Sequence, residues 1–132
     1  MKFLLDTNIL ADVIRNPQGR AARQVTAVGD QAVCTSIVVA AELWYGAIKR
    51  NSNRLTWQVE AVLRTIEILA LESPVEHVYG ELRARLEQAG NQIGGNDLLI
   101  AAQTISLGLT LVTDNEREFS RIAELPCANW LN

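Results

Sequence analysis

The pattern of hydrophobic and polar positions divides the 132-residue chain into short apolar runs and longer segments with helical spacing. The apolar runs predict strands over residues 2–5, 32–35, 66–71, 109–113 and 127–130. Apolar positions three and four residues apart predict helices over residues 8–15, 20–28, 36–50, 54–65, 74–90, 97–107 and 115–122. Turn-forming residues such as Asn16-Pro17-Gln18-Gly19 separate these segments. Strands and helices therefore alternate along the chain.

This alternation predicts an α/β fold of three layers, in which helices cover both faces of a central parallel sheet of four to five strands. The chain has no internal repeat, low-complexity tract or linker, and its length suits one domain, residues 1–132. Ligands of such sheets bind beyond the carboxyl ends of the strands. The polar residues that follow the strands are therefore the first candidates for a functional site.

Composition excludes several classes of protein. No apolar run reaches the roughly 20 residues of a membrane span, and an aspartate interrupts the short apolar run at the N-terminus. We therefore expect a cytoplasmic protein. Cys34 and Cys127 form no CxxC pair, and His77 is the only histidine. A zinc site, a disulfide framework or a Ser-His-Asp triad is therefore poorly supported.

The net charge of −3 argues against non-specific binding of nucleic acid through an overall basic surface. It does not exclude a nuclease, because divalent cations in an acidic pocket still attract phosphate. The basic residues occur in small groups, most of which we expect on solvated helix faces and one or two beside a site. These groups are Arg15, Arg20 and Arg23; Lys49, Arg50 and Arg54; Arg83 and Arg85; and Arg117 and Arg121.

Asp6 stands at the carboxyl end of the first predicted strand and is followed by Thr7 and Asn8. All three residue types cap helices well, so Asp6 could serve the next helix as a cap. Three such residues in a row are more than one helix needs. The alternative is that Asp6 is a metal ligand and that Thr7 or Asn8 orients it.

Glu42 interrupts an otherwise apolar helical run from Ile37 to Trp44. A helix that is apolar nearly all round should be largely buried. A carboxylate inside it is costly unless it is paired or bound to a metal. The alternative is that Glu42 marks a narrow exposed stripe near Lys49.

Asp97 follows two glycines and Asn96 at the start of a predicted helix. The helix dipole alone favours an acid there, but Asn96 could cap the helix and leave Asp97 to point into a pocket. Asp114 follows a strand that ends at Thr113, and Asn115 with Glu118 has the spacing of a capping box. Asp114 is then a spare acid at a strand end.

Several carboxylates at one sheet edge repel one another unless a cation binds between them. Oxygen ligands without a histidine favour Mg²⁺ or Mn²⁺ over zinc or iron. One or two such ions would activate water, polarise a phosphoryl oxygen and stabilise the leaving oxygen. The residues therefore favour phosphodiester hydrolysis, which needs no nucleophilic side chain.

Five short motifs, taken together in order and spacing, resemble a PIN-domain ribonuclease and are most similar to the VapC toxins of bacterial type II toxin–antitoxin systems. They are Leu5-Asp6-Thr7-Asn8, Ala41-Glu42-Leu43 with Tyr45-Gly46, Ile93-Gly94 leading to Asp97-Leu98-Leu99-Ile100-Ala101, Leu111-Val112-Thr113 with Asn115, and Glu118-Phe119. The resemblance extends over essentially the whole chain.

This resemblance implies a Mg²⁺-dependent endoribonuclease, with Mn²⁺ able to substitute, whose metal ligands are Asp6, Asp97 and Glu42. A fourth catalytic group is expected near Asp114. Many relatives carry an acid two residues after the threonine, where this chain has Asn115, so either Asp114 replaces that acid or the position is neutral. The resemblance also implies a homodimer, a VapB-type antitoxin and a structured RNA substrate such as tRNA.

Other classes of protein fit less well. A haloacid-dehalogenase-type phosphatase needs an aspartate where this chain has Asn8, and a receiver domain needs a cluster of acids at the first strand. A non-catalytic PIN-like module that binds RNA or protein remains the main alternative.

Overall fold

A computed structural model describes all 132 residues and contains one parallel sheet of five strands in the order β3-β2-β1-β4-β5. Its strands are β1 (Phe3–Leu5), β2 (Val33–Ser36), β3 (Glu67–Leu69), β4 (Thr110–Val112) and β5 (Cys127–Ala128). Every neighbouring pair is parallel. The predicted α/β fold is therefore confirmed, with five strands rather than four.

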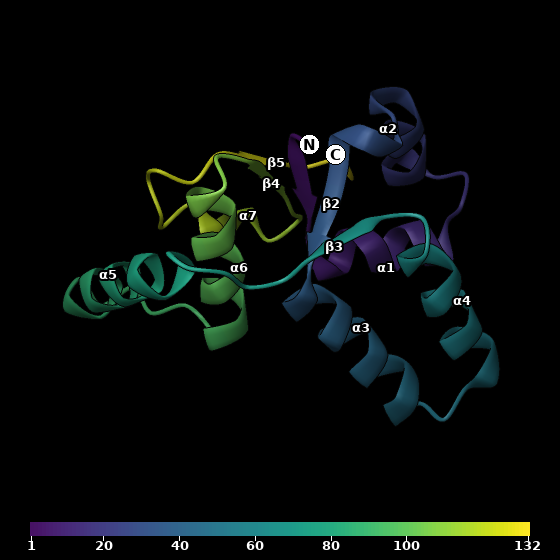
Figure 1. The fold of residues 1–132 in the computed structure, drawn as a ribbon, viewed down its shortest axis with the longest axis horizontal. Helices are drawn as coiled ribbons and strands as arrows, with labels where there is room; N and C mark the ends of the chain where they lie inside the picture. Colours follow the sequence, from purple (N-terminus) through teal and green to yellow (C-terminus); the bar gives the residue numbers. More distant parts are fainter.

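Two groups of helices enclose the sheet (Figure 1). The first group is α1 (Thr7–Arg15), α2 (Arg20–Val28), α3 (Ile37–Lys49) and α4 (Asn53–Leu63), with the short 3-10 helix η1 (Asp30–Ala32) after α2. The second group is α5 (Val75–Gln88), α6 (Gly95–Ser106) and α7 (Glu116–Phe119). The chain adds β2 and β3 on one side of β1 and then returns to add β4 and β5 on the other side. Right-handed crossovers therefore place the two groups on opposite faces of the sheet.

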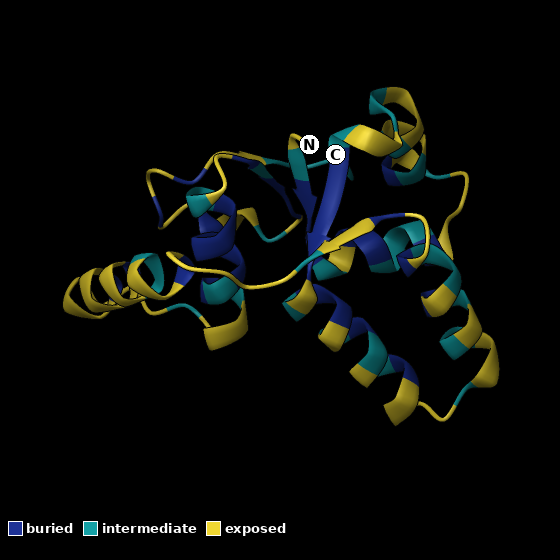
Figure 2. Ribbon diagram, viewed as in Figure 1, coloured by how far each residue is buried: buried dark blue, intermediate teal, exposed yellow.

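The hydrophobic core runs through the central strands. Leu4 and Leu5 of β1 and Leu111 and Val112 of β4 are fully buried, as expected for strands covered on both faces. The edge strand β3 is mostly exposed, and Figure 2 shows this difference between centre and edge. None of the helices is both long and apolar enough to cross a membrane.

Capping explains where two helices begin. The Ser36 hydroxyl accepts a hydrogen bond from the Val38 N–H, and the Ser52 hydroxyl accepts one from the Leu55 N–H. The cap expected at Asn96 is wrong, because α6 begins at Gly95 with Gly94 at the N-cap position. Asp97 is still in the first turn of that helix.

The expectation that α3 is largely buried is also wrong. Its outer face exposes 65% of Tyr45 and 67% of Ile48, while Val39, Leu43 and Ala47 pack into the core. An apolar residue on a helix can face a core or a protein partner, and the sequence pattern does not separate the two.

Candidate active site

Asp6 directly follows β1, and Asp114 comes two residues after the end of β4, its paired neighbour, in which Val112 is in register with Leu5. The carboxyl ends of parallel strands meet at one sheet edge. Helix α3, which carries Glu42, begins directly after β2, and α6 carries Asp97 in its first turn. The fold therefore directs all four predicted acids towards the same edge.

Asp6 is 5% exposed and uses both carboxylate oxygens. Its Oδ1 accepts a hydrogen bond from the Thr7 N–H at 2.8 Å, which caps α1. Its Oδ2 accepts one from the Thr113 hydroxyl at 2.8 Å. Asp6 is therefore a helix cap, and its carboxylate is also held in one orientation by Thr113, the residue after β4. Each of these oxygens keeps a further lone pair for a ligand.

Glu42 is half-buried and bonded to the first turn of α1. The Thr7 hydroxyl donates to Glu42 Oε1 at 2.6 Å. The alternative of an exposed stripe with Lys49 is not supported, because Glu42 forms no ion pair and the Lys49 ammonium lies over the Tyr45 ring instead. Thr7 therefore links two of the predicted acids, Asp6 and Glu42.

The charges of the acids act on one another. The pKa of Asp97 is raised to about 7, first by burial and then by the charges of Asp6, Glu118 and Glu42. The pKa of Asp6 is raised by burial, with contributions from the charges of Glu42 and Asp114, while the hydrogen bonds from Thr113 and Thr7 oppose the rise. No basic side chain pairs with any of these acids. The site thus concentrates negative charge without neutralising it.

Glu118 belongs to this group although its spacing from Asn115 suggested only a capping box. Its Oε1 accepts from the Gly94 N–H, and its Oε2 accepts from the Asn115 side-chain amide, both at 3.2 Å. The capping box itself is absent, because the Asn115 N–H donates to the Thr113 hydroxyl instead. Glu118 therefore links α7 to the loop that precedes Asp97.

Asp114 lies at the rim of the site. It is exposed, and its Oδ1 accepts a hydrogen bond from the Asn8 side-chain amide at 3.1 Å. Its charge contributes to the raised pKa of Asp6, which indicates that the two carboxylates are close enough to repel each other. Asp114 is thus less enclosed than Asp6 or Asp97.

The donor chemistry fits a divalent cation. No three acidic, histidine or cysteine side chains are packed tightly enough to form a ready-made ligand cage. Mg²⁺ does not require one, because it binds through few carboxylates and keeps several waters. Asp6 is buried, and the pKa values of Asp6 and Asp97 are both raised, so each carboxylate is costly in its charged form. A bound cation would stabilise that charged form.

Comparison with known proteins gives a consistent result. Residues 3–125 match the model of the PIN domain family. The chain is 37% identical to Ribonuclease VapC2 of Rickettsia felis over 132 residues, covering 98% of both chains. It is 34% identical to the tRNA(fMet)-specific endonuclease VapC of Shigella flexneri, again over 98% of both.

A solved structure has the same fold. The VapBC2 structure from Rickettsia felis, bound to a DNA fragment from the promoter, contains a chain that superposes with a TM-score of 0.91. That chain is 35% identical, and the match covers 98% of this chain and 99% of the other. Family match, sequence identity and fold agree, and they show that the chain belongs to the PIN-domain family and, within it, to the VapC ribonucleases.

Proposed function

We propose that this ribonuclease is the toxin of a type II toxin–antitoxin pair and a Mg²⁺-dependent endoribonuclease that cleaves tRNA in the cytoplasm. One observation carries the proposal: Asp6, Glu42 and Asp97 meet at one sheet edge, within one another's field and without a basic partner. A cluster of this kind costs stability unless a cation binds to it.

Asp6, Asp97 and Glu42 are the residues that would hold the metal, and Mn²⁺ would substitute for Mg²⁺. When bound, the ion supplies activation of water and stabilisation of charge on the phosphoryl group and the leaving oxygen. Thr113 and Thr7 orient Asp6 and Glu42 through the hydrogen bonds described above. Asn115 positions Thr113 and Glu118.

Asp114 and Asn8 form the rim of this site, and we assign Asp114 as the fourth catalytic group. An acid here would contact the substrate or an outer water of the ion, because it is more exposed than Asp6. Asn115, at the position where many relatives carry an acid, donates from its side-chain amide to Glu118 and is a neutral neighbour of the site.

The partners follow from the relatives and from the surface. The Shigella relative is named for tRNA(fMet), and the Rickettsia structure is a VapBC complex. A VapB-type antitoxin would block this site by inserting a basic side chain, which charge complementarity favours. Binding of the antitoxin or of a second copy of the chain requires exposed apolar surface. The outer faces of α3 and α4 supply such a surface, because they expose Tyr45, Ile48 and 70% of Trp57.

Cleavage of purified bulk tRNA tests the proposal. The parent protein should cut tRNA with Mg²⁺ or Mn²⁺ and should stop when EDTA is added, and Asp97→Asn should not cut under any of these conditions. Cutting that survives EDTA or the substitution would contradict the assignment. A well-folded parent that cuts no RNA would instead favour the non-catalytic RNA-binding module.

A further inference from the structure

Three arginines outside the acidic site line a row of shallow hollows. A hollow of about 550 Å³ is lined by Arg15 and Arg20, together with the 16–19 turn and Leu131. A second hollow, of about 590 Å³, is lined by Arg20, Arg23 and Trp130. Because Arg20 lines both, the two hollows adjoin. We call Arg15, Arg20 and Arg23 the arginine track.

One end of the track, Arg15, also lines a hollow that reaches Thr7 and Glu42 of the acidic site. This third hollow, of about 220 Å³, has Arg15, Arg50, Thr7 and Glu42 among its lining residues, and the rest of its lining is mostly apolar. Arg15 therefore belongs both to the track and to the hollow that reaches the acids. Helix α1 separates Thr7 from Arg15 by eight residue steps, or about 12 Å.

Local structure explains why these arginines lie together. A Cβ on Gly19 would lie 3.0 Å from Asn16 Cβ and 3.2 Å from the Asn16 carbonyl oxygen, so a glycine allows the tight turn between α1 and α2. Arg23 then donates from Nε to the Gly19 carbonyl. The C-terminal segment lies beside α2 (Figure 1), and Trp130 packs edge-on against Phe3 with ring centroids 5.0 Å apart.

The charges of the track are free. Arg15, Arg20 and Arg23 are exposed, and none of them forms an ion pair. The one acidic side chain lining the first two hollows is that of Asp12, whose Oδ1 accepts a hydrogen bond from the Asn16 side-chain amide. A chain with a net charge of −3 thus carries a locally positive surface at the far end of α1 from Thr7.

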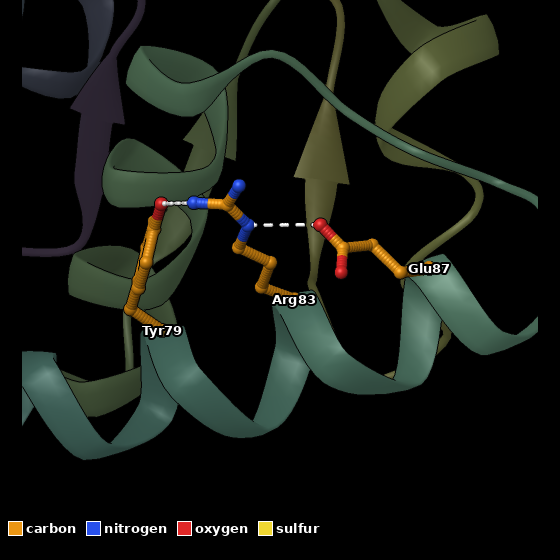
Figure 3. Close-up of polar contacts among 3 residues, drawn as sticks. All are labelled: Tyr79, Arg83 and Glu87. Carbon is orange, nitrogen blue, oxygen red and sulfur yellow. Dashed lines mark hydrogen bonds and ion pairs between the residues drawn. The ribbon is translucent and has the colours of Figure 1, made fainter.

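Three other arginines differ in this respect. Arg64, Arg83 and Arg85 each form an ion pair with a glutamate, at 2.8, 3.0 and 2.6 Å. Figure 3 shows Arg83 donating to both Glu87 and the Tyr79 hydroxyl. These arginines form a matched control, because their charges are already partnered.

We propose that the arginine track binds phosphates of the RNA substrate at a distance from the acidic site, along the surface that starts at Arg15, an inference that rests on the proposed ribonuclease function. Guanidinium groups form paired hydrogen bonds with phosphate oxygens. Trp130 adds an aromatic side chain beside Arg20 and Arg23 on which a base can stack. The track offsets the repulsion between RNA and the carboxylates, which a substrate must overcome to reach Glu42.

Binding of labelled bulk tRNA, measured by fluorescence anisotropy, tests the track. All proteins carry Asp97→Asn to prevent cleavage, and salt is varied. In this background, R15Q/R20Q/R23Q should bind tRNA about tenfold more weakly or worse. A plot of the logarithm of the association constant against log[salt] has a negative slope, and the loss of three phosphate contacts should make that slope shallower by about 2. R15K/R20K/R23K should keep the parental slope, because it keeps the charges. R64Q/R83Q/R85Q removes the same number of charges and should change little.

A glutamine triple variant that binds like the R64Q/R83Q/R85Q control would overturn the proposal. So would a lysine variant with the reduced slope of the glutamine variant, because the effect would then be structural. Thermal melts of each variant establish that it folds, and R15Q/R20Q replaces the triple if that variant does not.

Steady-state cleavage with Asp97 restored separates this proposal from the proposed function. R15Q/R20Q/R23Q should raise KM for tRNA about tenfold with little change in kcat. If the parent cleaves tRNA and the variant has the parental KM, the track is refuted and the ribonuclease function stands. If the parent never cleaves but tRNA binding depends on the track, the ribonuclease function fails and the track stands as an RNA-binding surface.

Discussion

The carboxylates at the strand ends contrast with those on the outer surfaces of α4 and α5. Glu60 and Glu87 each pair with an arginine one helical turn away, and Glu124 pairs with Arg85 of α5 (Figure 3 shows one such pair). Arg85 lowers the pKa of Glu124. At the sheet edge, burial and neighbouring acids raise the pKa values of Asp6 and Asp97 instead.

This difference indicates what each group does. Exposed ion pairs contribute little to stability, so the surface glutamates are interchangeable with neutral residues. Buried and unpaired carboxylates oppose folding, and a protein that keeps them needs them for binding. Substitution of the carboxylates at the sheet edge should therefore abolish activity, whereas substitution of the surface glutamates should not.

The largest expected effect is on cleavage. Asp6→Asn or Asp97→Asn should lower tRNA cleavage by about 10³-fold or more, because each removes an oxygen ligand of the metal. Glu60→Gln removes one surface charge and should leave the rate within about twofold. Initial rates with saturating Mg²⁺ measure the effect. Equal losses in Glu60→Gln would show that net charge, rather than the site, controls activity.

A smaller loss should follow when only the orientation of Asp6 changes. Thr113→Val removes the hydroxyl that donates to Asp6 Oδ2 and should cost about 10- to 100-fold in activity or metal affinity. Thr65→Val, whose hydroxyl bonds only to the Val62 carbonyl on an exposed turn, is the control. Parental activity in Thr113→Val would mean that the role of Asp6 does not depend on the hydrogen bond from Thr113.

Stability should change in the opposite direction from activity. Without metal, Asp97 has a pKa raised from 3.8 to about 7, so its ionisation destabilises the fold increasingly as the pH rises from about 4 to about 7. Asp97→Asn should therefore raise the free energy of unfolding by about 1–2 kcal/mol above pH 7, after allowance for its exposed side. The melting temperature in EDTA should rise by roughly 3–6 °C, and the gain should vanish near pH 4. A lower melting temperature at pH 8 would show that Asp97 is structural.

The smallest effect is expected at Glu124, with the reverse dependence on pH. Its lowered pKa means that its ion pair stabilises the fold above the unfolded pKa of 4.5 and that this contribution is lost as the pH falls through the folded value. Glu124→Gln should cost about 0.5 kcal/mol at pH 7, measured by urea unfolding, and nothing at low pH. If Glu124→Gln raised the free energy of unfolding at pH 7, as Asp97→Asn is expected to do, the two kinds of carboxylate would not differ.

Local signals in the sequence predicted much of this structure. Helix α2 has the predicted bounds, and the acids that follow β1 and β4 lie at one edge because parallel strands require it. Glu118 could not be assigned from its spacing, because a capping box and a long-range contact with Gly94 have the same local pattern. The exposed face of α3 was missed because apolar residues serve both cores and interfaces.

Direct titration with Mn²⁺, followed by electron paramagnetic resonance of the free ion, tests the central claim that these acids form one cation site. The parent should bind Mn²⁺ more tightly as the pH rises through about 7, because Asp97 must lose its proton for the ion to bind. Asp97→Asn should weaken binding by about tenfold or more and remove this pH dependence, while Glu60→Gln should change neither. Binding of Mn²⁺ by Asp97→Asn with parental affinity and parental pH dependence would contradict the claim.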